Sequence, residues 1–353
     1  MTKKKFKILS IDGGGIKGIF PARLLALIED ELKNKGDGRS KIYQRFDLIT
    51  GTSTGGVIAL ALSLGINAKE IYGLYINNSK RIFGKKRYCI GQIFNSSYKN
   101  YYLETLIRNT FKAINSGIDP LINDCKTNVC IPIYDLEKGK PSVVKSRYHL
   151  SFQRDYHIPA YQVALATSAA PTYFDPYTVT YRDSSGRTQN FSNKVDGGVM
   201  VNNPTLVGLI EAIKAFNIDI SDLEILSIGT GYRRFIEKTN QKDKNWFTSI
   251  IGNNKKWGLY YWMLKNNRKR LMELFMQSQS QLVENYMNLL HKGIDESEVS
   301  NPNFVYDRID VQLDKSNNIK MDEFDKTKLK NFAELASIKF KENRKSLMKN
   351  HFY

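Results

Sequence analysis

The N-terminal part of the chain twice repeats a short apolar segment, a glycine-rich turn and a helix-like segment. In the first unit, an apolar run over 6–11 precedes the glycine loop 12–18, and a helical periodicity follows Pro21 and ends at 35–38. In the second, 46–50 precedes the turn 51–56, which leads into an apolar run over 57–64. Strand, turn and helix repeated in this way predict an α/β protein with a largely parallel sheet and helices on both faces.

The rest of the chain divides near Tyr232, where the composition changes. Before it, the pattern predicts a helical, irregular stretch over 70–113. Asn203 is the expected N-cap of a helix whose first residue is Pro204. We therefore expect a core over 6–232 and a helical extension packed on it over 233–353. Further strands are predicted at 129–136, 142–145 and 224–228, and further helices at 161–168, 257–291 and 325–348.

Composition excludes several classes of protein. The 353 residues are 41% hydrophobic and 25% charged, near globular averages, which excludes wholesale disorder. The longest apolar run, over 57–62, is far shorter than the roughly 18–20 residues of a membrane-spanning helix. We expect no export signal, because Asp12 and the glycine loop interrupt the segment after the basic start. Three cysteines without metal-ligand spacing fit a reducing cytosol and predict no zinc site.

The chain is strongly basic, with 53 Lys and Arg residues against 35 acids and a formal charge of +18. A cytosolic protein this basic usually meets a polyanion, either nucleic acid or an anionic lipid surface. Aromatic and apolar residues edged by cations over 255–270 suit a lipid surface, and the basic cluster 80–87 adds to it. Two alternatives stay open: the charge reflects genome bias, and the apolar stretch is core for the C-terminal helices.

Residues 51–55 read Gly-Thr-Ser-Thr-Gly, a G-x-S-x-G motif between a predicted strand and a predicted buried helix. A nucleophile on so sharp a turn has strained dihedral angles, and Gly51 and Gly55 relieve the crowding around it. The helix beginning at Thr54 directs its partial positive end towards the hydroxyl of Ser53. The alternative is an ordinary turn with an exposed serine.

The loop from Gly13 to Gly18 also fits G-x-G-x-x-G, the fingerprint of a nucleotide-cofactor-binding protein. The acid that should bind the ribose is missing from its place, because the acids at that distance, residues 29–31, lie inside the first helix. The next strand ends in the serine turn instead. Bare amide N–H groups of consecutive glycines can form an oxyanion hole, which is the other interpretation of this loop.

A serine nucleophile needs a proton acceptor, and Asp196 is the best candidate. It follows a predicted strand and precedes Gly197 and Gly198, which allow close backbone approach. Partial burial against the serine would raise its pKa towards a useful range. The alternative for Asp-Gly-Gly is a plain turn. No histidine lies in a glycine-rich turn; the four are His149, His157, His291 and His351.

Taken together, these motifs resemble the patatin-like phospholipase family. The resemblance rests on the loop from Asp12 to Gly18, the serine turn and the Asp-Gly-Gly turn, in that order. It covers most of 6–232 and weakens after that, where 306–309 and 321–322 are similar to segments of longer members. The segments 166–174, 202–204 and 227–231 also resemble segments of that family.

The resemblance implies a three-layer α/β/α fold with a Ser–Asp dyad, in which Ser53 is the nucleophile and Asp196 the base. The amides of Gly13, Gly14 and Gly15 would form the oxyanion hole. Lys17 stands where many members carry Arg, which keeps the charge but loses the bidentate fork. The implied chemistry is hydrolysis of acyl esters of membrane glycerophospholipids, without a metal or an organic cofactor.

Length and the C-terminal extension make the chain similar to phospholipase effectors of bacterial anti-phage signalling. That similarity implies a cytoplasmic enzyme acting at the inner face of the cell membrane, activated by a cyclic di- or trinucleotide. We also expect a homo-oligomer and no DNA or RNA partner. A constitutive housekeeping lipid acyl hydrolase is the close alternative, and a nucleotide-cofactor-binding protein the more remote one.

Overall fold

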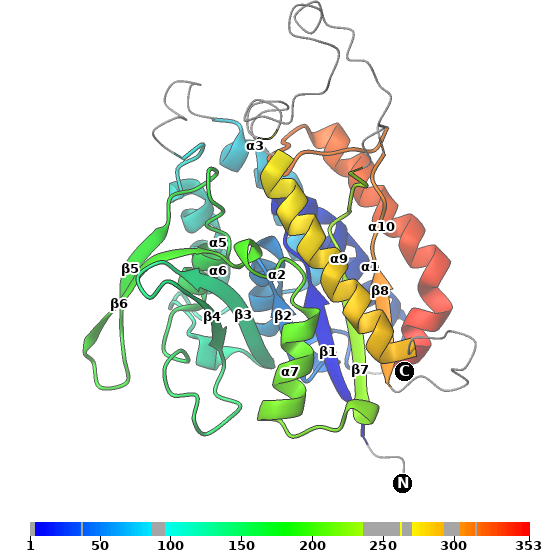
Figure 1. Ribbon diagram of the computed structural model, residues 1–353, viewed down its shortest axis with the longest axis horizontal. Coiled ribbons are helices and arrows are strands. Elements are labelled where there is room, and N and C mark those ends of the chain that lie inside the picture. Colours follow the sequence, from blue (N-terminus) through cyan, green and yellow to red (C-terminus); the bar gives the residue numbers. More distant parts are fainter. Residues whose placement is uncertain are drawn as a thin grey trace, which may run out of the picture.

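A single eight-stranded sheet forms the centre of the molecule (Figure 1). The computed structural model describes residues 4–36, 38–85, 96–235, 262, 270–292, 304–314 and 316–353. Its strands are β1 (Phe6–Ile11), β2 (Leu48–Gly51), β3 (Asn128–Asp135), β4 (Lys140–Lys145), β5 (Tyr177–Arg182), β6 (Thr188–Asp196), β7 (Leu223–Ile228) and β8 (Val305–Ile309). They lie in the order β5-β6-β3-β2-β1-β7-β8, and β4 pairs with β3.

The middle of the sheet is parallel, as the repeated units predicted. Strands β3, β2, β1, β7 and β8 all pair in parallel. Antiparallel pairs occur at one side, where β4 and β6 join β3 and β5 joins β6. The carboxyl ends of β1 and β2 therefore lie next to each other, which places the glycine loop beside the serine turn.

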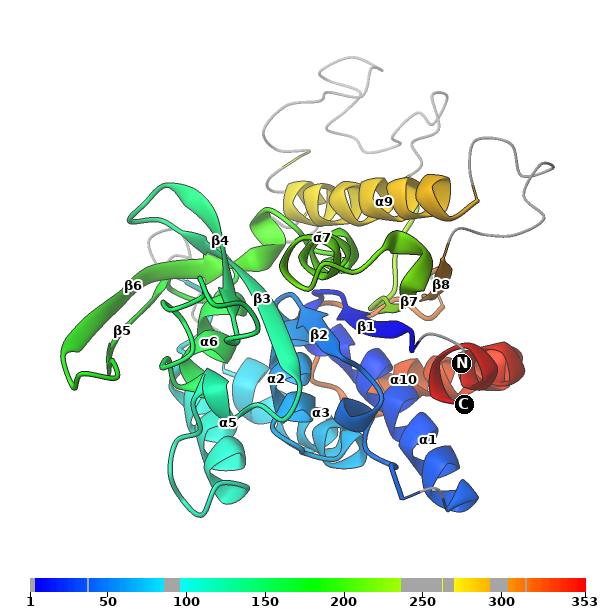
Figure 2. The same ribbon diagram turned by 90° about the horizontal axis from the view of Figure 1, so that it is seen from below.

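Helices cover both faces of the sheet, which confirms the three-layer fold (Figure 2). Helices α1, α2, α3 and α10 lie on one face, while α7 and α9 lie on the other. The helices are α1 (Ile19–Lys35), α2 (Thr54–Ser63), α3 (Ala68–Phe83), α5 (Tyr101–Ala113), α6 (Ala160–Thr167), α7 (Thr205–Ala215), α9 (Arg270–Lys292) and α10 (Lys326–Leu347).

Strand β1 shows why its sequence forms a central strand. Its side chains alternate between the faces, so Ile8 packs with Leu209 of α7 and Met287 of α9. Leu9 and Ile11 pack into the larger core on the other face. All three β1 side chains are fully buried, and a strand covered on both sides needs such a nearly continuous apolar run.

The C-terminal part contributes more than helices. Strand β8, which was not predicted, pairs in parallel with β7 and extends the central sheet. Helix α10 was predicted, and Asp325 caps it by accepting from the amides of Thr327 and Lys328, each at 2.9 Å. Of the hairpin formed by β5 and β6, the sequence predicted only the end of β6, at Asp196. The division of the chain at residue 232 stays a prediction.

One predicted helix start is wrong by a residue. Helix α7 begins at Thr205 and Pro204 is its N-cap, whereas Pro204 was expected to be the first helical residue. Asn203 nevertheless caps the start of this helix, because its Oδ1 accepts from the Thr205 amide at 3.1 Å.

The proposed membrane-contact segment 255–270 lies outside the described residues, except for Trp262 and the backbone of Arg270. Helix α9 accounts for the second part of the helix predicted over 257–291. Within the described ranges, no helix combines the length and the apolar character needed to cross a bilayer.

Candidate active site

Ser53 occupies a strained turn between β2 and α2. Its backbone has φ 55° and ψ −125°, a left-handed conformation that is rare for residues other than glycine. A Cβ atom on Gly51 would lie 2.1 Å from the carbonyl oxygen of Gly55, and one on Gly55 would lie 2.2 Å from that of Ile11. Both positions must therefore be glycine, and the serine side chain is directed away from this contact at the N-terminus of α2.

Asp196 meets Ser53 at the end of β6. Ser53 Oγ donates to Asp196 Oδ2 at 2.5 Å, although the residues lie 143 positions apart. Asp196 Oδ1 accepts from the Gly198 amide at 2.7 Å. Both side chains are almost fully buried, at 4% and 3% exposure. Burial raises the pKa of Asp196 to about 7, although the hydrogen bonds from Ser53 and Gly198 act in the opposite direction.

The pair is held against β3 from two sides. Thr167 Oγ1 accepts from the Ser53 amide at 3.1 Å and donates to the Pro132 carbonyl at 2.7 Å. A Cβ on Gly197 would lie 2.3 Å from that same carbonyl oxygen, so the turn after Asp196 needs glycine there. Only the family resemblance of 166–174 pointed to Thr167, because a single threonine at a helix end carries no signal of this contact.

The glycine loop lies beside the serine, but its three amides are not equivalent. The Gly13 amide donates to the Asn202 carbonyl at 3.0 Å, and the Gly13 carbonyl accepts from Thr230 Oγ1 at 2.7 Å. In the described part of the chain, nothing accepts from the amides of Gly14 and Gly15. Two amides are thus free for an oxyanion, whereas the Gly13 amide is engaged; the three-amide hole stays a prediction.

Other loop residues have structural partners that explain the motif. Asp12 pairs with Arg308 of β8, which was not predicted. A Cβ on Gly18 would lie 2.3 Å from Thr54 Oγ1, so this glycine lets the loop pack on α2. Lys17 forms no ion pair with any described residue, and burial lowers the pKa of its ammonium group. Glu29, one of the acids of the cofactor-binding alternative, instead accepts from backbone amides at both carboxylate oxygens.

Two cavities meet at this loop. One is almost wholly apolar, and Ser53 and Gly15 belong to its lining. Its other walls come mainly from α2, α3, α5 and the segment 168–174, and they include Val57, Phe83 and Leu106. The second cavity is more polar and is lined by residues of the glycine loop, of the segment after β7, and of α9. Ser53 thus lies in the wall of the apolar cavity, and the glycine loop contributes residues to both cavities.

The four histidines lie elsewhere. His149 is exposed and bonds to Ser151 Oγ at 2.7 Å, and His351 is buried against Asp307, with Nε2 and Oδ2 2.8 Å apart. No histidine is hydrogen-bonded to Ser53 or Asp196 in the described structure. Among the described residues, no cluster of three or more His, Cys, Asp or Glu side chains could hold a metal ion.

Comparison with known proteins agrees with this geometry. A family model described as "Patatin-like phospholipase" matches residues 9–209, a span that contains Ser53 and Asp196. The chain is 31% identical to a cGAMP-activated phospholipase of Escherichia coli (strain TW11681), over all of this chain and 94% of that protein. It is 36% identical to a cGAMP-activated phospholipase of Vibrio cholerae over 65% of each. It is 28% identical to patatin-like protein 2 of Oryza sativa subsp. indica, over 82% of this chain and 74% of that protein.

The tight serine turn predicts opposite effects for two Gly→Ala changes. Gly55→Ala should lower the free energy of unfolding by roughly 1–3 kcal/mol or more, because the added methyl group overlaps a backbone oxygen. Gly73→Ala in the middle of α3 is the matched control. Its nearest neighbour would be 3.9 Å away, so better helix propensity should raise stability by about 0.5–1 kcal/mol. Urea unfolding measures both; equal stability of the two variants would contradict the close approach at the turn.

Proposed function

Because the chain belongs to the patatin-like phospholipase family and is a lipid acyl hydrolase, we propose that Ser53 and Asp196 are its catalytic dyad. The substrates are fatty acyl esters of membrane glycerophospholipids. The observation that carries the proposal is the 2.5 Å hydrogen bond from Ser53 Oγ to Asp196 Oδ2 beside an apolar cavity. A buried serine in a strained turn, paired with a carboxylate of raised pKa, is the arrangement that acyl transfer needs.

The dyad can carry out both halves of the reaction. Ser53 Oγ attacks the ester carbonyl carbon while its proton passes to Asp196, and the Gly14 and Gly15 amides stabilise the oxygen that becomes negative. When the ester C–O bond breaks, Asp196 returns the proton to the leaving alcohol oxygen, and the acyl group stays on Ser53. In the second half, Asp196 takes a proton from a water molecule whose oxygen attacks the acyl carbon. The bond from that carbon to Ser53 Oγ then breaks, Asp196 returns the proton to Ser53 Oγ, and the fatty acid is released.

The two cavities fit the two ends of a lipid. The apolar cavity beside Ser53 accepts an acyl chain, and each buried methylene contributes about 0.8 kcal/mol. The polar cavity on the other side of the glycine loop includes Lys17, Arg233 and Ser280 in its walls and suits the polar part of the molecule. The ester carbonyl then lies between them, next to the nucleophile.

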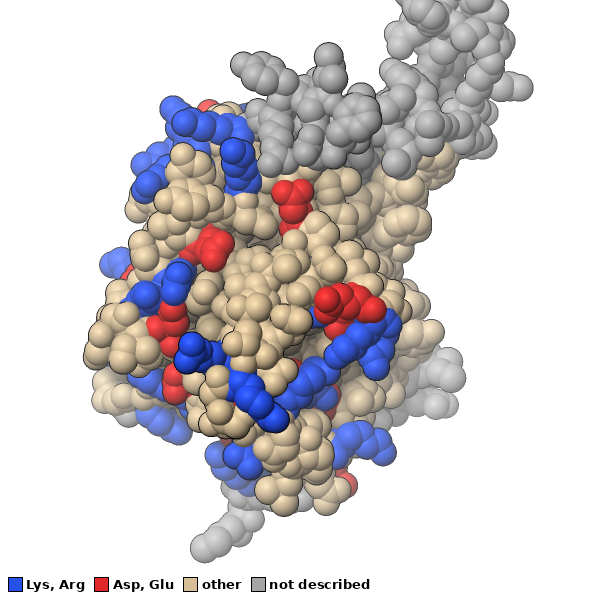
Figure 3. Space-filling view, turned by 90° about the vertical axis from the view of Figure 1, so that its left-hand side faces the viewer, with Lys and Arg blue, Asp and Glu red and all other residues tan. Residues whose placement is uncertain are grey.

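Exposed cations near the apolar cavity support contact with an anionic lipid surface. Lys80, Arg81 and Lys85 are exposed at the C-terminal end of α3 and just after it, and Tyr101 and Tyr102 are exposed at the start of α5. Neighbouring residues of both helices line the cavity. Figure 3 shows Lys and Arg side chains, with some Asp and Glu side chains among them, around an uncharged area on one face of the protein. We infer that the enzyme acts at the inner face of the cell membrane.

Substitution of the dyad tests the proposal. Ser53→Ala should abolish both labelling by a fluorophosphonate and release of fatty acid from phospholipid vesicles. Asp196→Asn keeps the shape but removes the proton acceptor, so turnover should fall by about 10²–10⁴-fold. Ser63→Ala, which changes another buried serine of α2, is the matched control and should keep full activity. Labelling that persists in Ser53→Ala would place the nucleophile elsewhere.

We further propose that the enzyme is an anti-phage effector, which a cyclic di- or trinucleotide switches on so that it degrades the cell membrane. Support comes from the two bacterial relatives, which are cGAMP-activated phospholipases. The formal charge of +18 suits a ligand that carries phosphate charges. The active state is proposed to be a homo-oligomer. In an assembly, the small preference of each nucleotide site for the active state is multiplied over the protomers. The alternative is a constitutive lipid acyl hydrolase.

A ligand panel separates these two functions. Vesicle hydrolysis should rise at least about tenfold with one member of a set of cyclic di- and trinucleotides that includes cGAMP, since the ligand must bind the active state more tightly. Light scattering on Ser53→Ala should show a larger particle with that ligand. Full activity without nucleotide, and no change of size with any of them, would favour the constitutive enzyme.

A further inference from the structure

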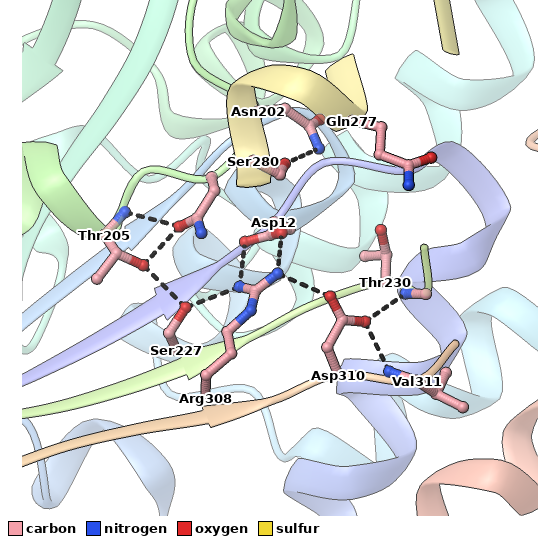
Figure 4. A network of polar contacts seen from close by, with 12 residues as sticks. Asp12, Asn202, Thr205, Ser227, Thr230, Gln277, Ser280, Arg308, Asp310 and Val311 are labelled. Atoms are coloured by element: carbon pink, nitrogen blue, oxygen red, sulfur yellow. Dashed lines mark hydrogen bonds and ion pairs between the residues drawn. The ribbon is translucent and has the colours of Figure 1, made fainter. Parts of the chain in front are cut away.

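Arg308 of β8 lies buried beneath the glycine loop, with its side chain 8% exposed (Figure 4). Its guanidinium is shared between two carboxylates: Nη2 lies 2.6 Å from Asp12 Oδ2 and 2.7 Å from Asp310 Oδ2. Nη1 donates to Asp12 Oδ1 at 2.9 Å and to Ser227 Oγ at 2.8 Å. The proposed function gives this arginine no role, and the residues that it joins all lie close to the predicted oxyanion hole.

The first connection runs through Asp12, the residue directly before the three glycines. A bidentate pair fixes both the distance and the plane of the two groups. The backbone of Asp12 is held as well, because its amide donates to the Ile228 carbonyl at 3.0 Å. Arg308 therefore fixes the point at which the glycine loop leaves β1.

The second connection runs through Asp310. Its Oδ1 accepts from the amides of Gly231 and Val311, each at 2.8 Å. Thr230, next to Gly231, donates from Oγ1 to the Gly13 carbonyl at 2.7 Å. In a planar trans peptide the carbonyl and the following N–H point in opposite directions. Holding the Gly13 carbonyl therefore sets the direction of the Gly14 N–H.

We propose that Arg308 is a positioning residue of the acyl-transfer site, which aims the Gly14 N–H at the developing oxyanion through Asp12 and through Asp310 and Thr230. This inference rests on the proposed function. Arginine suits the role because its flat fork can serve two carboxylates and a hydroxyl at once, whereas a lysine has a single nitrogen. A buried ion pair adds little net stability compared with apolar packing, so orientation is the better explanation of its presence.

The test compares catalysis with ground-state binding. For Arg308→Gln, hydrolysis of a soluble short-chain ester should show kcat lowered by about 10–100-fold and KM changed by less than about threefold; removing a whole oxyanion donor lowers kcat by about 10²–10³. Affinity for a trifluoromethyl ketone, which forms a tetrahedral adduct with the serine, should fall by a similar factor. Arg308→Lys should lie between Arg308→Gln and wild type.

Thr230 offers a second, milder test that leaves the ion pair in place. Thr230→Val removes only the hydroxyl that holds the Gly13 carbonyl, so kcat should fall by about tenfold or more. Thr230→Ser keeps the hydroxyl and should keep kcat within about twofold of wild type. If Arg308→Gln does not fold, the two Thr230 variants still test whether this chain of contacts positions the Gly14 N–H.

Asp307→Asn is the matched control on the same strand. Its carboxylate bonds to His351 and Asn350, away from the loop, so the change should lower stability while kcat stays within about twofold. Wild-type kcat in folded Arg308→Gln and in Thr230→Val would overturn the inference, as would an equal loss of kcat in Asp307→Asn. If wild type is no more active than Ser53→Ala, either alone or with any nucleotide of the panel, the proposed function itself fails; if wild type is more active but Arg308→Gln matches it, only the positioning role fails.

Discussion

The hydrogen bond between Ser53 Oγ and Asp196 Oδ2 joins two side chains that are almost completely removed from water. Such a contact forms only where the surrounding backbone leaves neither group an alternative partner in solvent. Strand β3 makes this possible, because it lies between β2 and β6 and offers one carbonyl, that of Pro132, against which both turns pack. The glycines and Thr167 are the residues that let the two turns approach it.

This arrangement lowers the stability of the folded protein. Ser53 stays in a left-handed conformation, and Asp196 is a carboxyl group whose pKa burial raises to about 7. A raised pKa in the folded state means that this group favours folding at low pH and that its contribution is lost as the pH rises towards 7. The Asp196 carboxyl group therefore contributes less to stability at neutral pH than at low pH.

The central fold could be predicted because its signals are local, whereas the pairing of Ser53 with Asp196 was implied by the family resemblance. The strand, glycine turn and helix of the two repeated units are each encoded in adjacent residues, and glycines two positions either side of Ser53 indicate its turn. Arg308 had no such signal, since it lies 296 positions from Asp12 and a lone cation in a short strand does not say which carboxylate it meets. Strand β5 did carry an alternating β-branched pattern that could have revealed it. The hydrogen bond of the Gly13 amide depends on a distant carbonyl and could not be read from the loop.

The pH dependence of serine reactivity tests most directly whether Asp196 is the base. The measurement is the second-order rate constant for labelling of Ser53 by a water-soluble fluorophosphonate between about pH 5 and pH 9, under conditions where the protein stays folded. Asp196 accepts the serine proton only as a carboxylate, so with a pKa of about 7 the rate constant should level off above that pH. Below it, the rate constant should fall by about tenfold per pH unit. A rate constant that stays the same from about pH 8 down to about pH 5 would contradict a buried Asp196 as the proton acceptor.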